Sequence, residues 1–311
     1  MNWRLKALVQ NLIDKLPEAM SYPIYYKVQR NFGGLRKINP MAHYQKSINL
    51  IEKIKNHDYD VTDKTFLEIG TGRTINVPTG LWLCGASKII SVDLHKYLKE
   101  ELVIESVNYL KAHKDEVQNL FGDLGKTEIF RNRFSQLMSI EVSLDKLLEQ
   151  MNIEYLAPAD AASLPIDDNS IDFHSSTNVF EHIPRNLIGS ILLEAKRVLS
   201  KDGLFVHLID LSDHFSHGDE SITTINFLRY NEKEWNKLAG NKFMYHNRLR
   251  KNKFLELFEK QGATLLSKEQ VINKRALELL NKGFPLDEGF VGESFENSAV
   301  SHLALVGNFN S

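Results

Sequence analysis

The chain has 311 residues, of which 42% are hydrophobic and 25% charged, and its formal net charge is -2. This is the composition of a globular protein with enough apolar residues for a sizeable core, which excludes disorder of the whole chain. The small net charge argues against a nucleic-acid partner, because such binding depends on a broad positive field.

The N-terminal residues 1–60 are expected to form a helical extension of a main domain that spans 61–311. Apolar residues recur at helical spacing from Trp3 to Leu16 and predict an amphipathic helix. This helix either packs on the main domain or on a second copy of the chain, giving a homodimer, or lies on a membrane surface. Residues 22–39 are expected to be a connector, and a second helix is expected at about 41–56.

Three features bear on where the protein resides. No apolar run of about 18 residues occurs, so no transmembrane segment is expected. Polar residues, among them Gln10 and Asp14, interrupt the N-terminal apolar stretch, which is unlike a signal peptide. The single cysteine, Cys84, lies in an apolar stretch and is expected to be a buried, inert thiol. Together these features predict a cytoplasmic protein.

From Lys64 onward, short apolar runs alternate with helical segments, a pattern typical of a parallel sheet covered on both faces. We expect an α/β fold with a doubly wound, mostly parallel, seven-stranded Rossmann-like sheet. Its strands are predicted at 65–69, 88–92, 153–157, 171–175, 204–209, 264–271 and 301–307. Two intervals are longer than one crossover helix needs. We expect a helical insertion at about 115–150 and a lid-like insertion at about 211–261.

The first predicted strand ends in Glu68 and runs into a turn that contains Gly70, Thr71 and Gly72. Glycine permits a sharp turn and lets a ligand approach the backbone closely. Dinucleotides and S-adenosylmethionine both bind at such turns. A dinucleotide site would need a third glycine where this chain has Ile75. An acidic side chain would also repel a pyrophosphate, whereas it suits a cationic amino acid.

Further polar residues follow the next strands. Asp93 ends the second strand, 25 residues after Glu68, and its carboxylate could accept hydrogen bonds from both hydroxyls of a ribose. Asp160 and Ala161 follow the third strand. The fourth strand leads into the segment from Ser175 to Pro184, which contains Glu181 and His182.

These four segments, in this order over about residues 64–210, resemble the motifs of class I S-adenosylmethionine-dependent methyltransferases, most closely the group called type 11. Thr74 departs from the family pattern, because it replaces the third glycine of G-x-G-x-G. The resemblance implies S-adenosylmethionine as cofactor, with Glu68 near the methionine end and Asp93 on the ribose. The implied cofactor residues are Glu68, Gly70, Thr71, Gly72, Asp93, Leu94, Asp160, Ala161 and Asn178.

More loosely, the chain resembles bacterial enzymes of glycan and natural-product clusters, which share the segments Asp210–His214 and Asn247–Arg250. This resemblance implies methylation of an oxygen on a small polar acceptor, such as a sugar or nucleotide sugar. Carbon or nitrogen methylation on the same fold is one alternative. A cofactor-binding regulatory partner without turnover is another.

Histidines supply the candidate bases, because an oxygen or nitrogen acceptor must lose a proton. His182 follows the fourth strand, and His214 and His217 follow the fifth, at the sheet edge where ligands bind in such folds. The loop 210–219 could instead hold a divalent cation, although no metal is predicted. Four further residues would either clamp an anionic group of the acceptor or lie at the surface at the start of a helix: Arg229, Tyr230, Arg248 and Arg250.

Overall fold

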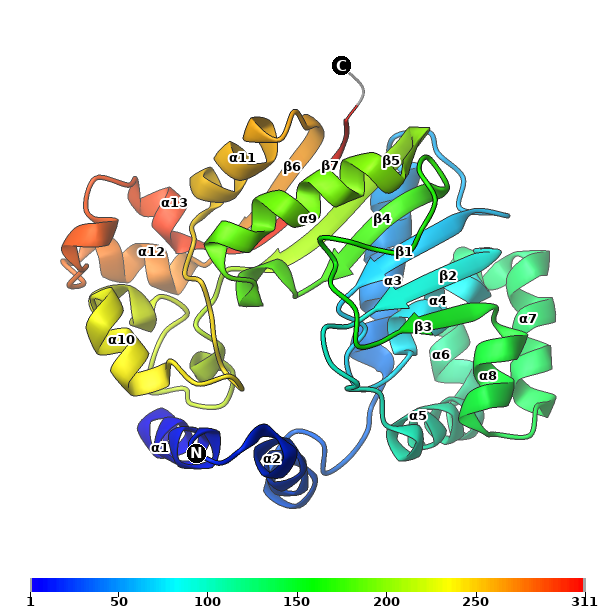
Figure 1. Ribbon diagram of the computed structural model, residues 1–311, viewed down its shortest axis with the longest axis horizontal. Helices are drawn as coiled ribbons and strands as arrows, with labels where there is room; N and C mark the ends of the chain where they lie inside the picture. The colour runs from blue at the N-terminus through cyan, green and yellow to red at the C-terminus, as the bar shows by residue number, and fades with distance from the viewer. Residues whose placement is uncertain (1, 310–311) are drawn as a thin grey trace.

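The computed structural model describes residues 2–309 as a seven-stranded sheet with helices on both faces (Figure 1). The strand order is β3-β2-β1-β4-β5-β7-β6. Strands β1 to β5 are parallel to one another, whereas β7 runs antiparallel to β5 and β6. The predicted α/β fold with a mostly parallel sheet is therefore confirmed.

The strands lie close to their predicted positions. They are β1 (Thr65–Ile69), β2 (Lys88–Val92), β3 (Ile153–Leu156), β4 (Ile171–Thr177), β5 (Leu199–Asp210), β6 (Thr264–Ile272) and β7 (Val300–Asn308). β5 differs most from the prediction, because it begins at Leu199 rather than at residue 204. Leu199 pairs with Ile171, and after an irregularity in the register the pairing resumes at Phe173 and Leu204.

Each face of the sheet has its own hydrophobic core, because successive side chains of a strand point to opposite faces. On β1, Phe66 joins one core and Leu67 joins the other. The Phe66 core is covered by α3 (Met41–Lys55), α4 (Asn76–Leu83), α5 (Glu100–Ala112), α6 (Lys114–Leu120), α7 (Glu128–Ser139) and α8 (Leu144–Gln150). The Leu67 core is covered by α9 (Arg185–Val198) and α11 (Lys251–Lys260). The loops that follow the strands lie at the carboxyl edge of the sheet, between the two helical layers.

The expectation of a connector over residues 22–39 is wrong for its first part. Helix α2 extends over Glu18–Phe32, and only the residues that follow it connect to α3. Pro23 lies inside α2 and lowers its intrinsic helical preference. Tertiary contacts outweigh this cost: Tyr25 stacks on Phe243 at 4.1 Å between ring centroids, and Arg30 pairs with Glu105 of α5 at 2.5 Å.

A third hydrophobic core joins the N-terminal helix to the segment that follows β5. Trp3 of α1 (Trp3–Asp14) packs against Phe215 and Trp235, and the last of these lies on α10 (Glu232–Ala239). Helices α12 (Lys274–Asn281) and α13 (Phe295–Ala299) contribute to the same core. In Figure 1, α1 and α2 lie below the sheet, with α10 above one end and α5 near the other. The N-terminal helices thus run alongside the loops at the carboxyl edge.

The buried face of helix α1 does not contain most of its leucines. Trp3 and Ala7 are buried, whereas Leu5, Leu8 and Leu12 are each more than half exposed. Trp3 anchors the helix in the third core, so that these leucines face outward.

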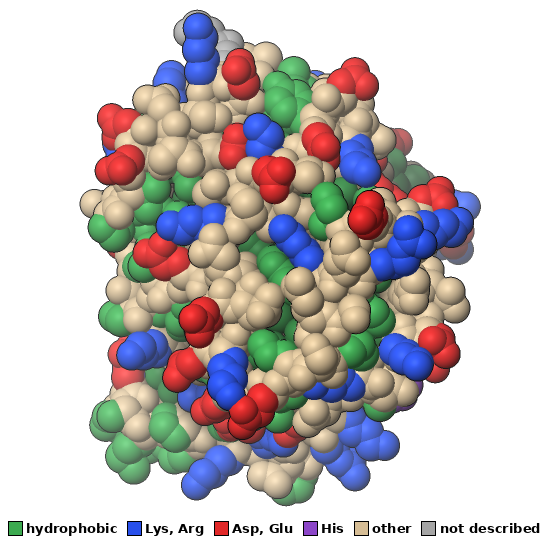
Figure 2. Space-filling view, turned by 90° about the vertical axis from the view of Figure 1, so that its right-hand side faces the viewer, with side chains coloured by type: hydrophobic (Ala, Val, Ile, Leu, Met, Phe, Trp, Pro, Cys, Tyr) green, Lys and Arg blue, Asp and Glu red, His purple; other side chains and the backbone are tan. Residues whose placement is uncertain are grey.

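The described part of the chain also contains five short 3-10 turns: η1 (Leu124–Lys126), η2 (Phe180–His182), η3 (His214–His217), η4 (Asn226–Arg229) and η5 (Glu288–Phe290). On the face that carries α7 and α8, basic and acidic side chains are interspersed (Figure 2). Within residues 2–309, none of the helices is both long enough and apolar enough to cross a membrane.

Candidate active site

The glycine turn after β1 has a backbone that only glycine adopts readily. Gly70 and Gly72 have φ angles of +79° and +78°, in the left-handed region. A Cβ atom at Gly70 would lie 2.4 Å from Val179 Cγ2, whereas one at Gly72 would meet nothing within 4 Å. Packing therefore requires glycine at 70, and Gly72 presents a bare backbone to open space.

Two buried carboxylates support this turn. Glu68 accepts hydrogen bonds from Thr71 Oγ1 at 2.7 Å and from Ser91 Oγ at 3.2 Å. Asp93 accepts from the main-chain N–H of Gly72 at 2.9 Å and from the Tyr155 hydroxyl at 3.0 Å. Burial raises the pKa of each carboxyl to about 7, although these hydrogen bonds oppose the shift. The turn thus has acidic groups whose ionisation a cationic or hydroxyl-rich ligand would favour.

A cavity of about 570 Å³ opens beside the turn on the Asp93 side. The predicted cofactor residues that line it are Gly70, Gly72, Asp93, Leu94, Asp160, Ala161 and Asn178. Leu94 and Leu187 also border it and are 63% and 47% exposed, so apolar surface is available to a flat ring. His182, one of the predicted bases, lies on the same wall.

A second cavity of about 470 Å³ lies on the other side of the turn. Glu68 and Thr71, the two predicted cofactor residues absent from the first cavity, line this one. The connector and α3 supply a polar wall that contains Lys37, Asn39, His43 and Lys46. The two cavities share Gly70, Gly72 and Asn178, so they adjoin at the turn. All nine predicted cofactor residues therefore border one continuous region at the carboxyl edge.

The three predicted histidines lie together where β4 and β5 end. The ring centroid of His214 is 4.9 Å from that of His182 and 5.0 Å from that of His217. Asp210, the last residue of β5, has its Oδ2 atom 3.5 Å from His214 Nε2 and 3.6 Å from His217 Nε2. Ser212 donates from Oγ to Asp210 Oδ1 at 2.5 Å, and the same Oγ lies 2.9 Å from His217 Nε2.

Asp210 gives this cluster a negative charge. Burial alone would raise the pKa of Asp210, but His214 and Ser212 hold it well below the usual range of an aspartate. An ionised carboxylate next to imidazoles fixes their orientation.

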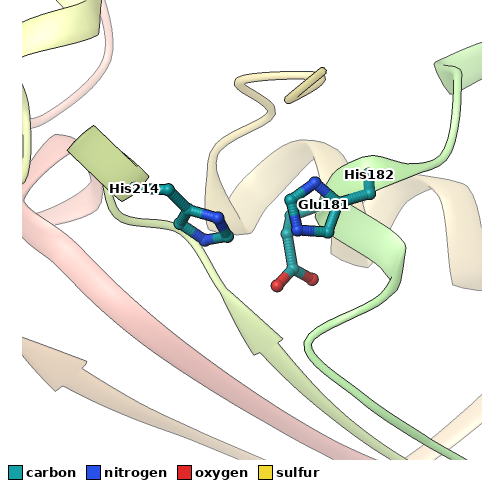
Figure 3. A group of neighbouring side chains, drawn as sticks. All are labelled: Glu181, His182 and His214. Atoms are coloured by element: carbon teal, nitrogen blue, oxygen red, sulfur yellow. The ribbon is translucent and has the colours of Figure 1, made fainter. Parts of the chain in front are cut away.

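Glu181 completes the group and was not among the predicted site residues. It precedes His182 on η2, and its carboxylate lies near the rings of His182 and His214 (Figure 3). Its side chain is fully buried, and neither oxygen has a hydrogen-bond partner among residues 2–309. Burial raises the pKa of Glu181 well above its usual value. The sequence marked this residue only as part of a motif.

Two more residues were missed because folding alone brings them here. His246 lies 5.2 Å from His214 between ring centroids, with its Nε2 atom 3.3 Å from the carbonyl oxygen of Asp210. Lys46 of α3 lies close enough for its charge to act on Glu181, Asp210 and Glu68. Neither belongs to a recognisable motif, and no spacing in the sequence indicates them.

Two of the arginines considered as a substrate clamp, Arg248 and Arg250, bind main-chain carbonyls instead. Arg250 is 2% exposed and donates from Nη1 to Leu211 O at 2.6 Å and from Nη2 to the carbonyl oxygens of Ser298 and Val300. Arg248 donates to the carbonyl of Tyr230 at 2.7 Å. Because main-chain carbonyls occupy these guanidinium groups, neither arginine is a surface charge or a free anion clamp.

The fold places two adjoining cavities at the carboxyl edge of the sheet, where ligands bind in open α/β folds. A family model described as a methyltransferase domain matches residues 121–207, which contain Asp160, Glu181 and His182. The matched segment lies within the region, about residues 64–210, whose four ordered motifs resemble those of class I S-adenosylmethionine-dependent methyltransferases. A comparison with curated proteins found no match.

Among solved structures, the chain is similar to geranyl diphosphate C-methyltransferase from Streptomyces coelicolor A3(2), at 12% identity and a TM-score of 0.46. That alignment covers 86% of this chain and 84% of the other. It is also similar to the PH0226 protein from Pyrococcus horikoshii OT3, at 15% identity and a TM-score of 0.45, over 91% of this chain and 97% of the other.

Proposed function

We propose that the chain transfers the methyl group of S-adenosylmethionine to an oxygen atom of a small polar acceptor, with sugar-like compounds and nucleotide sugars as the acceptor class. When bound, the cofactor supplies a methyl carbon that leaves its sulfonium sulfur, on which the C–S electron pair stays. The acceptor oxygen contributes the electron pair of the new C–O bond and loses its proton. The protein must therefore position the oxygen and receive that proton.

The cofactor residues fit this ligand in two parts. Asp93, with its carboxylate facing the larger cavity, would hold the ribose, and Leu94 and Asp160 would border the adenine. Glu68 and Thr71 would lie at the methionine end, on the other side of the turn. Gly72 supports this placement, because no atom lies within 4 Å of the position that a Cβ would take there, so the cofactor can approach its backbone closely.

The observation that carries the proposal is the position of the histidine cluster beside the cofactor cavity. His182 lines that cavity, and the ring centroid of His214 lies 4.9 Å from that of His182. A hydroxyl acceptor needs groups that can hold its oxygen and receive its proton, and imidazoles suit both tasks. The polar wall formed by Lys37, Asn39 and Lys46 supports an acceptor rich in hydroxyl or phosphate groups.

We assign separate roles to the three rings. His217 receives the proton, because Ser212 donates to Asp210 and so accepts from His217 Nε2–H, which leaves the other ring nitrogen as a base. Its side chain is 53% exposed, so the proton can pass to water. His182 and His214 position the acceptor oxygen.

The test uses labelled S-adenosylmethionine with three acceptor panels: sugars and nucleotide sugars, amines, and compounds with activated carbon atoms. We expect turnover in the first panel. With the best acceptor, His217→Gln should lower kcat about 100-fold while cofactor affinity is unchanged. His57→Gln is the matched control, because His57 contacts Ser267 of β6 instead. Turnover confined to another panel would contradict oxygen transfer, and cofactor binding without any turnover would favour a regulatory role.

Two further expectations remain predictions. The cytoplasmic location is one, and cell fractionation would test it. The homodimer through the N-terminal helices is the other, and its support is the outward stripe of Leu5, Leu8 and Leu12 on α1. Sedimentation of the wild-type chain and of a Leu8→Ser variant would test it.

A further inference from the structure

We infer that Glu181, His182 and His214 bind one divalent first-row transition-metal ion, with zinc as its representative. The three residues come from η2 and η3, at the ends of adjacent strands β4 and β5. Each offers a ligand atom, and these atoms lie within 4.8 Å of one another (Figure 3). Ligand atoms at about 2.1 Å from one tetrahedral ion lie roughly 3.4 Å from one another. Small side-chain rotations would bring the three ligand atoms to that separation.

The first argument is the state of the Glu181 carboxylate. It is 0% exposed, and neither of its oxygens accepts a hydrogen bond within residues 2–309. The main-chain N–H groups of Glu181 and Asp210 and the charge of Lys46 favour the ionised carboxylate, but burial outweighs them and raises its pKa. A buried carboxylate without partners is costly unless a proton or a cation neutralises it. Two imidazoles next to it make a metal cation the suitable partner.

The second argument is the orientation of the imidazoles. His182 Nδ1 lies 2.7 Å from the Tyr245 carbonyl oxygen, so this nitrogen carries the proton and Nε2 keeps its lone pair. His214 Nε2 faces Asp210 Oδ2 at 3.5 Å, so Nδ1 is the nitrogen of that ring that would bind the metal ion. Metal-binding histidines generally direct their second nitrogen at a carbonyl or carboxylate in this way. Both rings are therefore set to act as ligands rather than as hydrogen-bond donors to Glu181.

The ligand set selects the class of ion. Two imidazoles and one carboxylate suit zinc and its first-row neighbours, whereas magnesium prefers oxygen ligands alone. Three protein ligands leave a coordination position open, as in catalytic zinc sites. His182 lines the cofactor cavity, so a molecule in that cavity can reach the open coordination position. The outside ligand would be the hydroxyl oxygen of the acceptor, and this last step alone rests on the proposed function.

The experiment measures zinc binding without acceptor or turnover. Full-length protein is stripped with a chelator, dialysed against zinc and analysed for metal content and melting temperature. We expect one zinc ion per chain and a melting temperature raised by about 5 °C at saturating zinc. Glu181→Gln and His214→Gln should each weaken zinc affinity at least 100-fold, and Asp210→Asn about 10-fold, because it only orients His214. His57→Gln should bind zinc like the wild type.

A second measurement guards against variants that fail to fold. Without metal, Glu181→Gln should melt at or above the wild-type temperature, because glutamine removes an unpaired buried charge. Zinc should then raise the melting temperature of the wild type and of the His57→Gln control, and not that of Glu181→Gln. Cobalt should give the visible absorption of a tetrahedral site in the wild type and not in Glu181→Gln. Wild-type protein that binds no zinc, or a folded Glu181→Gln variant that binds it equally well, would overturn the inference.

The outcomes separate this inference from the proposed function. Zinc binding that needs Glu181, combined with methylation of nitrogen or carbon, would overturn the oxygen acceptor and keep the metal site. Oxygen methylation that survives chelation, in a chain that binds no zinc, would overturn the metal site alone.

Discussion

Replacing Asp93 with asparagine should make the ligand-free protein more stable and the cofactor complex weaker. The pKa of Asp93 is raised to about 7, chiefly by burial, whereas an unfolded aspartate titrates near 3.9. The folded protein therefore holds this proton more tightly than the unfolded chain. As a result, the carboxyl lowers the free energy of unfolding progressively as pH rises from about 4 to about 7, and the loss is constant above that range.

The size of the effect follows from the three units between the two pKa values. At about 1.4 kcal/mol per unit, ionised Asp93 destabilises the folded chain by about 4 kcal/mol at pH 8. Asparagine keeps an oxygen that can accept from Gly72 N–H and the Tyr155 hydroxyl, and it carries no charge. Asp93→Asn should thus raise the free energy of unfolding by up to about 4 kcal/mol at pH 8 and by little at pH 4.

The same substitution should weaken S-adenosylmethionine binding at least 10-fold, because a carboxylate accepts both ribose hydroxyls more strongly than an amide does. Wild-type affinity should rise between pH 6 and pH 8, since the bound cofactor favours the ionised carboxyl, and the rise should be smaller in the variant. Urea unfolding at both pH values and calorimetric titration measure these effects. An Asp93→Asn variant with wild-type affinity, or with lower stability at pH 8, would refute this reasoning.

The remaining predictions concern the glycine turn and the buried arginine. Gly70→Ala should lower the free energy of unfolding by about 3 kcal/mol, because its Cβ would collide with Val179; equal stability would show that the turn adjusts freely. Gly72→Ala should lower it by only about 1 kcal/mol but weaken cofactor binding at least 10-fold, since its Cβ enters the open space of the cavities; unchanged affinity in calorimetry would place the cofactor elsewhere. Arg250→Met should cost about 3 kcal/mol of stability in urea unfolding, because three main-chain carbonyls lose their donor, while the KM for an acceptor stays unchanged in the folded fraction; a raised KM with normal stability would restore the clamp interpretation.

Strand patterns and strand-end motifs made much of this fold predictable. Short apolar runs separated by helical segments indicated all seven strands. Glu68 and Asp93 could be placed on one edge, because parallel strands end at the same side of a sheet. The hydrogen bond from Thr71 to Glu68 lies within one short segment of sequence, whereas the bond from Gly72 N–H to Asp93 joins the ends of two neighbouring strands.

The N-terminal helices were harder to predict, because tertiary contacts decide their structure. The aromatic residues and glycines of this stretch indicated a connector, and contacts with the distant residues Phe243 and Glu105 stabilise the helix there. In α1 the apolar spacing from Trp3 to Leu16 predicted an amphipathic helix, but it did not predict which of the apolar residues are buried. Trp3 packs against Trp235, whereas Leu5, Leu8 and Leu12 are more than half exposed.

The histidine cluster shows a similar limit. His182 and His214 could be placed at neighbouring strand ends, because β4 and β5 were expected in one sheet. The sequence could not predict that the Glu181 carboxylate accepts no hydrogen bond within residues 2–309, since this depends on every group packed around it. His246 lies in a loop without a motif, so only folding brings it to the cluster.

The identity of the methylated atom tests the central claim most directly. The wild-type protein is incubated with S-adenosylmethionine that carries a ¹³C-labelled methyl group and with a fractionated metabolite extract. The product is then examined by NMR. We predict a single labelled methyl resonance with the chemical shift and couplings of an O-methyl group on a hydroxyl-rich compound. A labelled methyl on nitrogen or carbon, or no labelled product from protein that binds the cofactor, would contradict the proposed function.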